Sequence, residues 1–242
     1  MNLVNTSVSN DHQKTPTSPV AQRKGERQRP KSGAGAITGL LLLATLPVIG
    51  GVLRLGEVSS GTDVDVPWTS IVAIVAHIVA MTVFTVLGAF QFSPVLRIRR
   101  GWHRTAGRVL IPAGIVAALA SIWLAVFFGG PRDEFALAMV RLVFAVPMVL
   151  FLVMSVIAIM RRDFTAHGAW MTRAYAIAVT GGTQALVVIV WTLIAGEVDA
   201  YGEAWLVAVG FVINSVVAEL LILRRSSRRK RGRSARGARG LE

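Results

Sequence analysis

Six long apolar runs constrain this chain more than any other feature of its sequence. They lie near residues 35–55, 68–92, 105–128, 137–160, 169–196 and 203–223. A hydrocarbon core about 30 Å thick requires roughly 20 apolar residues in a helix, and each run meets that requirement. The runs are continuous, whereas transmembrane strands are segments of about ten residues with strict alternation. We therefore expect an all-α fold, a polytopic membrane helix bundle with six transmembrane helices.

Composition supports the membrane assignment and excludes thiol chemistry. Of the 242 residues, 53% are hydrophobic, which leaves too little polar surface to cover a soluble fold of this size. Cysteine is absent, so neither disulfides nor thiolate metal sites can form. The first apolar run follows a long polar segment, unlike the short basic leader of a secretory signal peptide. We expect it to be a retained helix.

The distribution of charge predicts the orientation of the bundle. All but three of the 26 lysines and arginines fall in the two tails, in the loops before the third and fifth runs, or just inside those runs. The exceptions, Arg54, Arg132 and Arg141, lie toward the side on which most of the acidic residues cluster. By the positive-inside rule, both termini are cytoplasmic. The expected location is the bacterial cytoplasmic (inner) membrane. The net charge of +13 mainly reflects the basic residues that set the orientation of the helices.

The two tails are expected to be disordered, cytoplasmic and basic. They comprise residues 1–34 and the Arg-rich segment 224–242, with the transmembrane domain at 35–223 between them. A basic tail attracts anionic lipid headgroups, by about 1 kcal/mol per basic residue near the surface. No aromatic residues interleave with the C-terminal arginines, so we expect no binding to nucleic acid. The expected partner is the lipid bilayer.

Two arginine-rich loops each lead into a histidine and then into an arginine inside an apolar run. The first copy is Arg99, Arg100, His103 and Arg108, and the second is Arg161, Arg162, His167 and Arg173. A cation within a membrane-spanning helix costs roughly 2.5 to 3.5 kcal/mol, so it normally faces a partner, a cavity or a ligand. Glu219 reaches a similar depth, and Arg108 or Arg173 is its natural partner. These considerations predict a cytoplasmic-side polar cluster of His103, Arg104, Arg108, His167, Arg173 and Glu219.

Four further polar residues are expected inside the membrane: His77, Gln91, Gln184 and Asn214. His77 lies nine residues in from Trp68, at a depth of roughly 13 Å. It is either a hydrogen-bonded packing residue or a group that binds a cofactor or a proton. Gln91 lies on the same helical stripe as His77 and Gly88, and Gly88 would permit another helix to approach closely. Asn214 is expected to hold helices together.

These residues carry a resemblance to a known family. The segments are HIVAMTVFTVLGAFQFSPVLRIRRGWHRTAGRV from His77 and RRDFTAHGAWMTRAYA from Arg161, followed by Glu219 before a basic end. Together, over about residues 68–225, they resemble the bacterial predicted membrane proteins catalogued as domain of unknown function 2306. The resemblance assigns characteristic positions to His77, Gly88, Gln91, Phe92, Arg97, His103, Arg104, Gly107, Arg108, His167, Trp170, Met171, Arg173 and Glu219. It departs at Gly168, where an arginine is expected, and the family name implies no activity.

A more distant similarity is to transmembrane cytochromes b, which carry haem-ligating histidines on neighbouring helices. Each haem iron in such a protein takes two axial ligands at matching depth. His103 and His167 meet that requirement, whereas His77 has no histidine partner at its own level. The resemblance therefore implies one haem b at most, with the cofactor otherwise unknown.

Three classes of function are open at this point. The leading hypothesis is that the His/Arg/Glu cluster binds a small anionic or redox ligand, for which the planar donor fork of arginine is suited. A single-haem electron-transfer protein is one alternative, and a proton-coupled transporter using His77 and Gln184, or a non-catalytic scaffold, is another. Whether the protein is an enzyme is open. No grouping of serine, histidine and carboxylate in the sequence resembles a hydrolase site. The histidines lack carboxylates at ligand spacing, so no metal site is predicted.

Overall fold

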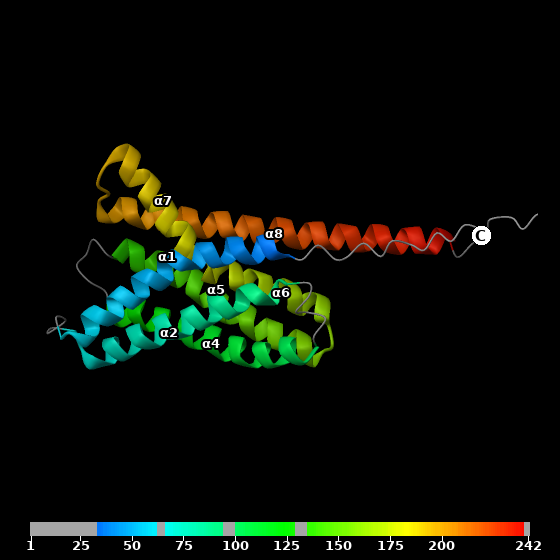
Figure 1. Ribbon diagram of the computed structural model, residues 1–242, viewed down its shortest axis with the longest axis horizontal. Helices are drawn as coiled ribbons and strands as arrows, with labels where there is room; N and C mark the ends of the chain where they lie inside the picture. The colour runs from blue at the N-terminus through cyan, green and yellow to red at the C-terminus, as the bar shows by residue number, and fades with distance from the viewer. Residues whose placement is uncertain (1–32, 62–65, 94–99, 129–134, 240–242) are drawn as a thin grey trace, which may run out of the picture. The chain divides into compact units, whose positions relative to one another are not determined.

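The computed structural model describes residues 33–61, 66–93, 100–128 and 135–239, and their regular structure is helical throughout (Figure 1). The helices are α1 (Ala34–Ser59), α2 (Trp68–Gln91), α4 (Arg100–Phe127), α5 (Phe135–Met160), α6 (Phe164–Ala178), α7 (Thr180–Ala195) and α8 (Ala200–Arg239). Six helical segments in the described residues are long and apolar enough to cross a membrane: Ala34–Ser59, Trp68–Gln91, Gly101–Phe127, Phe135–Met160, Phe164–Ala195 and Ala200–Arg228. The predicted all-α, six-span membrane fold is confirmed.

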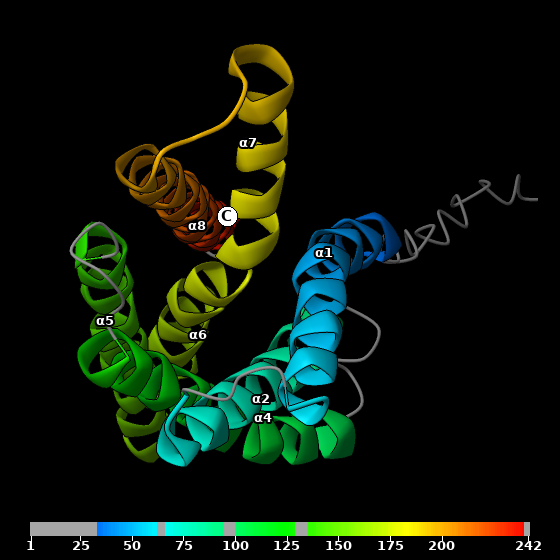
Figure 2. The same ribbon diagram turned by 90° about the vertical axis from the view of Figure 1, so that its left-hand side faces the viewer.

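The helices pack mainly against their neighbours in sequence. α2 packs on α4, α4 on α5, and α5 on α6, while α7 and α8 form a further antiparallel pair. α1 contacts α2 and α7, and α6 also contacts α8. Viewed end-on, α6 lies inside the arc made by α2, α4 and α5 (Figure 2). This arrangement makes α6 the helix around which the core forms.

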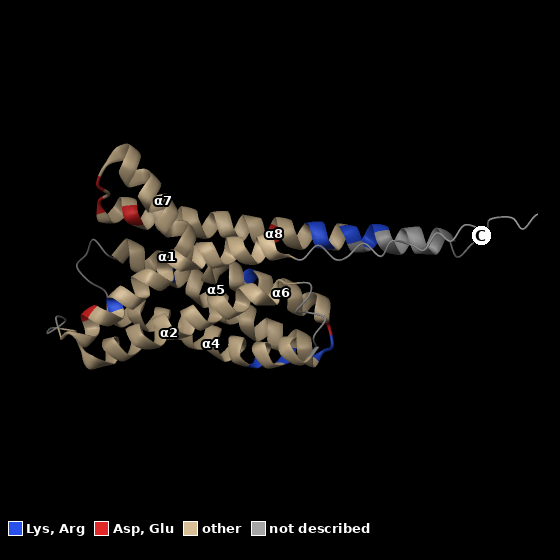
Figure 3. Ribbon diagram, in the orientation of Figure 1, with Lys and Arg blue, Asp and Glu red and all other residues tan. Residues whose placement is uncertain are grey.

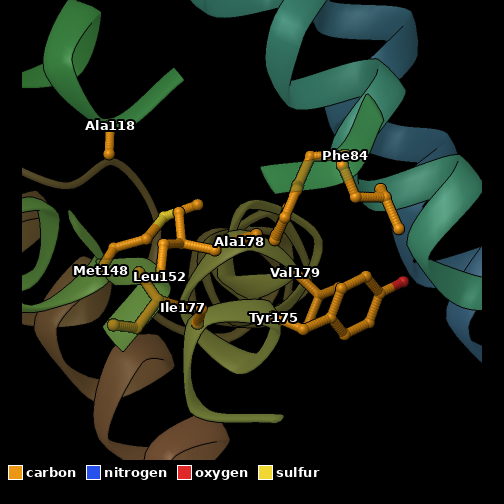
Figure 4. Packing of buried hydrophobic residues seen from close by; sticks show 10 residues of the cluster. Phe84, Ala118, Met148, Leu152, Tyr175, Ile177, Ala178 and Val179 are labelled. Carbon is orange, nitrogen blue, oxygen red and sulfur yellow. The ribbon is translucent and has the colours of Figure 1, made fainter. Parts of the chain in front are cut away.

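The core gathers around one buried tyrosine of α6. In the cluster, Ile177 lies on the side of Met148 and Leu152, and Tyr175 lies on the side of Phe84 (Figure 4). The Tyr175 hydroxyl donates a 2.7 Å hydrogen bond to the carbonyl oxygen of Thr85, which satisfies its polar end inside the bundle.

Gly88 makes room for this tyrosine ring. A Cβ atom at Gly88 would overlap the ring of Tyr175. The expected role of Gly88 in close packing is therefore confirmed, although the group that approaches it is a side chain of α6 rather than another helix backbone. The ring also lies 5.0 Å from that of Phe92, between centroids.

The fifth membrane span is broken into two helices, α6 and α7, at Val179. α7 leaves the direction of α6 at this point (Figure 2). Two glycines follow the break, and α1 packs directly on them: a Cβ at Gly182 would overlap the carbonyl oxygen of Leu43, and one at Gly181 would lie 3.2 Å from Cβ of Pro47. Pro47 has no N–H group to bond that Leu43 carbonyl within α1. Pro47 and the glycines thus shape the contact between α1 and α7.

Charge separates the two ends of the bundle (Figure 3). Arg104, Arg161 and Arg162 lie at the end where α4 begins and α5 ends, which we call the basic end. Glu57 and the acidic residues between α7 and α8 lie at the opposite end, which we call the acidic end. The positive-inside rule predicts that the basic end faces the cytoplasm.

The C-terminal segment differs from the sequence-based expectation. Residues from 224 onward were expected to be disordered, yet α8 continues as a helix to Arg239 and passes beyond the basic end of the other helices (Figure 1). Arginine, lysine and alanine favour helix, and extending an existing helix avoids a new nucleation step. The N-terminal tail, predicted as 1–34, lies outside the described residues as far as residue 32.

Candidate ligand-binding site

Glu219 and Arg173 form a two-point ion pair between α8 and α6. The Nε atom of Arg173 donates to Oε1 of Glu219 at 2.5 Å, and Nη2 donates to Oε2 at 2.9 Å. The guanidinium also lies 4.7 Å from the ring centroid of Trp170, a cation–π contact. Of the two candidate partners predicted for Glu219, Arg173 is the one that pairs with it. Because the charges neutralise each other, this part of the predicted cluster joins helices and presents little net positive charge.

His167 is held against α5 near the same end. Its Nδ1 atom lies 2.7 Å from the hydroxyl oxygen of Ser155 and 3.2 Å from the Ser155 carbonyl oxygen. Asp163 fixes the start of α6, since its side chain accepts hydrogen bonds from the backbone N–H groups of Thr165 and Ala166. His167 therefore helps to fasten α6 to α5.

The other members of the predicted cluster lie on α4. His103 is partly buried, whereas Arg104 and Arg108 are exposed. In the described parts of the chain, no carboxylate pairs with either of these arginines. α4 packs mainly on α2 and α5, while the Arg173–Glu219 pair joins α6 and α8. The structure thus brings two of the six predicted residues into an ion pair and places three others on a separate helix.

A cavity of about 270 Å³ lies toward the acidic end and is lined by residues from α1, α2, α4, α5, α6, α7 and α8. Its walls are apolar for the most part, with Pro47, Met81, Met148 and Phe211 among the lining residues. Its polar lining includes His77, Thr82, Ser121, Arg141, Gln184 and Glu203. Few polar groups on apolar walls are typical of a small-molecule site. Two of the intramembrane residues predicted from the sequence, His77 and Gln184, thus meet in one cavity.

His77 is fixed in the cavity wall by one ring nitrogen. Its Nδ1 atom lies 2.8 Å from the carbonyl oxygen of Ala117 on α4. A carbonyl oxygen only accepts hydrogen bonds, so Nδ1 carries the hydrogen. Nε2 of the neutral ring is then an acceptor, and in the described part of the chain it accepts no hydrogen bond. Of the two roles left open for His77, the bond from Nδ1 fits a hydrogen-bonded packing residue, and the residue also lines the cavity.

The remaining two intramembrane residues have separate environments. The Asn214 amide nitrogen donates to the hydroxyl oxygens of Thr180 and Thr183, at 3.1 and 3.0 Å, and so joins α8 to the first turn of α7. The expected role of Asn214 in holding helices together is confirmed. Gln91 is the last residue of α2, and its Nε2 atom is buried without a hydrogen bond among the described residues.

Comparison with protein families matches residues 74–222 to the family described as "Predicted membrane protein (DUF2306)". The match covers more than half of the 242 residues. The chain belongs to this family. No match was found among the curated proteins or the solved structures. The chain is thus a predicted integral membrane protein of unknown function, with multiple membrane-spanning helices.

The residues that match this family include the whole cavity lining except Pro47 and Val48 of α1. Sequence reasoning missed two of them, Arg141 and Glu203, which entered only the count of charges. A signal for Arg141 was present, since it is a cation six residues inside a membrane-spanning helix. Glu203 lies in the first turn of α8 at the acidic end, where a carboxylate alone carries no such signal.

Haem between His103 and His167 receives no support from this geometry. The two histidines lie on α4, which packs mainly on α2 and α5, and on α6, which packs mainly on α5 and α8, so their helices are not direct packing partners. None of the comparisons shows the more distant likeness to cytochromes b. In the described residues, no group of three or more His, Asp or Glu side chains is arranged to hold a metal ion.

Proposed function

We propose that this protein binds a small solute in the cavity and that the solute enters from the non-cytoplasmic side of the bacterial inner membrane. The observation that carries the proposal is the convergence of His77, Arg141, Gln184 and Glu203 from four helices on one cavity. Ionisable side chains inside membrane-spanning helices are costly and therefore mark functional sites. Glu203 lies in the first turn of α8, and Arg141 lies six residues into α5, both toward the acidic end, which the positive-inside rule directs away from the cytoplasm.

The broken fifth span favours a transport protein over a scaffold. Discontinuous helices line the solute sites of many transporters, because their irregular backbone is tolerated where it borders a cavity. Here Ala178 before the break and Gly181 after it both line the cavity. A volume of about 270 Å³ falls just below the usual range of roughly 300–1,000 Å³ for ligand pockets, so the solute is small.

Thiol labelling tests this proposal directly, because the native chain contains no cysteine. Ser121→Cys places a single thiol in the cavity wall on α4, and Leu119→Cys places one two residues away on a side chain that is 51% exposed on the outside of the bundle. A membrane-impermeant thiol reagent is added to intact cells. We expect the thiol at position 121 to be labelled and the one at 119 to be protected by lipid. Absence of labelling at 121, together with labelling of Glu203→Cys, would contradict an open cavity.

A second candidate function is favoured by the two arginines of α4 at the basic end. Arg104 and Arg108 are exposed, are one helical turn apart and pair with no carboxylate in the described residues. Such a pair suits an anion, either a free phosphate or the phosphate of a lipid headgroup. This candidate retains the small anionic ligand expected from the sequence.

Native mass spectrometry of the protein from phosphatidylglycerol nanodiscs tests the second candidate. Arg104→Gln with Arg108→Gln is expected to lose bound lipid, while Arg161→Gln, an exposed arginine at the same end, keeps it. Displacement by inorganic phosphate distinguishes a free anion from a headgroup. Equal retention of lipid by both variants would exclude the site.

A further inference from the structure

We infer that Nε2 of His77 is the hydrogen-bond acceptor of the cavity and that its ligand is a small, largely apolar molecule carrying a hydroxyl group. The inference rests on the proposed function, because it concerns the same cavity.

The first step is the fixed orientation of the imidazole ring. The 2.8 Å bond from Nδ1 to the Ala117 carbonyl holds the ring between α2 and α4 and assigns the hydrogen to Nδ1. The hydrogen position follows from the acceptor, since a carbonyl cannot donate. A neutral His77 therefore presents a lone pair on Nε2, and presents no donor there. Second partners of this kind set the role of the opposite nitrogen in many ligand-binding histidines.

The second step is the character of the other polar groups in the wall. Arg141 donates hydrogen bonds and cannot accept them, whereas the Gln184 amide and the hydroxyls of Ser121 and Thr82 can do either. Glu203 is an acceptor, but it lies in the first turn of α8 and is exposed at the acidic end. Unlike the amide and the hydroxyls, Nε2 of a neutral His77 can only accept, so a ligand without a donor would leave it unsatisfied.

The third step is the apolar surface that surrounds His77. Met81 and Ile78 follow it on α2, while Met148, Val207 and Phe211 line the cavity from α5 and α8. Apolar walls favour a ligand body without charge, because a desolvated charge would require a partner of its own. A molecule with one ring or a short chain and one hydroxyl satisfies both the walls and Nε2.

Phenol and its methyl ether, anisole, have the same ring, but anisole lacks a hydrogen-bond donor. Comparing their binding separates the contribution of the hydroxyl group from that of the ring. Their binding to the detergent-purified full chain is followed by nitrogen chemical shifts of ¹⁵N-labelled histidine. The chain has only four histidines, and the His77 signals are those that disappear in His77→Asn. We expect a neutral ring with hydrogen on Nδ1. Phenol is expected to shift Nε2 at concentrations about tenfold below those at which anisole acts, because an unsatisfied buried acceptor weakens binding.

Two substitutions separate ligand binding from packing. His77→Asn places an amide nitrogen near the position of Nδ1, so it keeps the bond to Ala117 and has no acceptor at the position of Nε2. His77→Gln extends to the position of Nε2, so it keeps an acceptor and loses that bond. We expect His77→Asn to unfold near the wild-type temperature without being stabilised by phenol, and His77→Gln to unfold earlier while phenol still stabilises it.

A ring with hydrogen on Nε2, equal shifts by phenol and anisole, or wild-type phenol binding by His77→Asn would each overturn the inference. These outcomes differ from failure of the proposed function. If the thiol at position 121 is not labelled from outside, the cavity itself is closed and the proposed function fails. If it is labelled while His77→Asn binds phenol like the wild type, the inference about His77 fails alone.

Discussion

The contact between α1 and α7 predicts that Gly182→Ala destabilises the bundle strongly. The added Cβ would overlap the carbonyl oxygen of Leu43 and stand 2.7 Å from its carbonyl carbon. Both atoms belong to the backbone of α1, so no side-chain rotation relieves the contact, and the two helices must separate. Overpacking of a tight contact costs about 1–3 kcal/mol, occasionally more, and a backbone contact belongs at the upper end of that range. We expect a loss of about 3 kcal/mol.

Gly50→Ala is the matched control for this substitution. Gly50 lies within α1, and a Cβ added there meets no atom within 4 Å. Replacing glycine by alanine in a helix interior is favourable by up to about 1 kcal/mol where space allows it. The unfolding free energies of both variants are measured by titrating purified protein in mixed micelles with a denaturing detergent. Equal stability of Gly182→Ala and Gly50→Ala would refute the account of the break in the fifth span.

Three further substitutions test individual contacts by the same unfolding measurement. Gly88→Ala should cost about 2 kcal/mol, since its Cβ overlaps a ring, and Tyr175→Leu in the same chain should recover part of that loss; no recovery would contradict the contact. Glu219→Gln should cost about 1 kcal/mol, a modest value because the side chains of Glu219 and Arg173 are 47% and 24% exposed, and an unchanged stability would show that the ion pair contributes nothing. Asn214→Leu removes hydrogen bonds between α8 and α7 and should cost about 0.6–1.7 kcal/mol; a gain in stability would argue against its role in joining them.

The membrane-spanning helices followed from the sequence because the bilayer imposes length and polarity on each of them. A cationic partner for Glu219 also followed, since a carboxylate at that depth requires one, but depth left Arg108 and Arg173 both possible, and the contact between α6 and α8 identifies Arg173. These inferences depend on position along the membrane normal, which a sequence supplies through helix rise.

The break at Val179 followed only in part, because Gly181 and Gly182 permit tight packing or local unwinding but do not show which helix packs on them. The residues that pack against these glycines are Leu43 and Pro47 of α1. No local sequence pattern connects residues so far apart in the chain. The bond from His77 to Ala117 has no sequence signature for a related reason, because the acceptor is a backbone carbonyl. The composition of the segment after 224 indicated disorder, whereas the preceding helix supplies the nucleus that extends through it.

The cluster predicted from the sequence lies at the basic end, whereas the cavity lies toward the acidic end, and helix packing explains the difference. His103, Arg104 and Arg108 share a depth with Arg173 and Glu219 but lie on a helix that packs elsewhere. Depth alone cannot show which helices face one another. Arg141 and Glu203 were treated as topological charges, yet both line the cavity that contains His77.

Sided labelling of Ser121→Cys tests the central claim most directly. The same impermeant thiol reagent is applied to intact cells and to inside-out membrane vesicles, with Leu119→Cys as the lipid-facing reference. An open cavity at the non-cytoplasmic side predicts rapid labelling of position 121 in cells, slow labelling in vesicles, and no labelling of position 119 in either. Labelling of position 121 in vesicles alone would contradict the proposed orientation, and its absence from both preparations would contradict the cavity as a solute site.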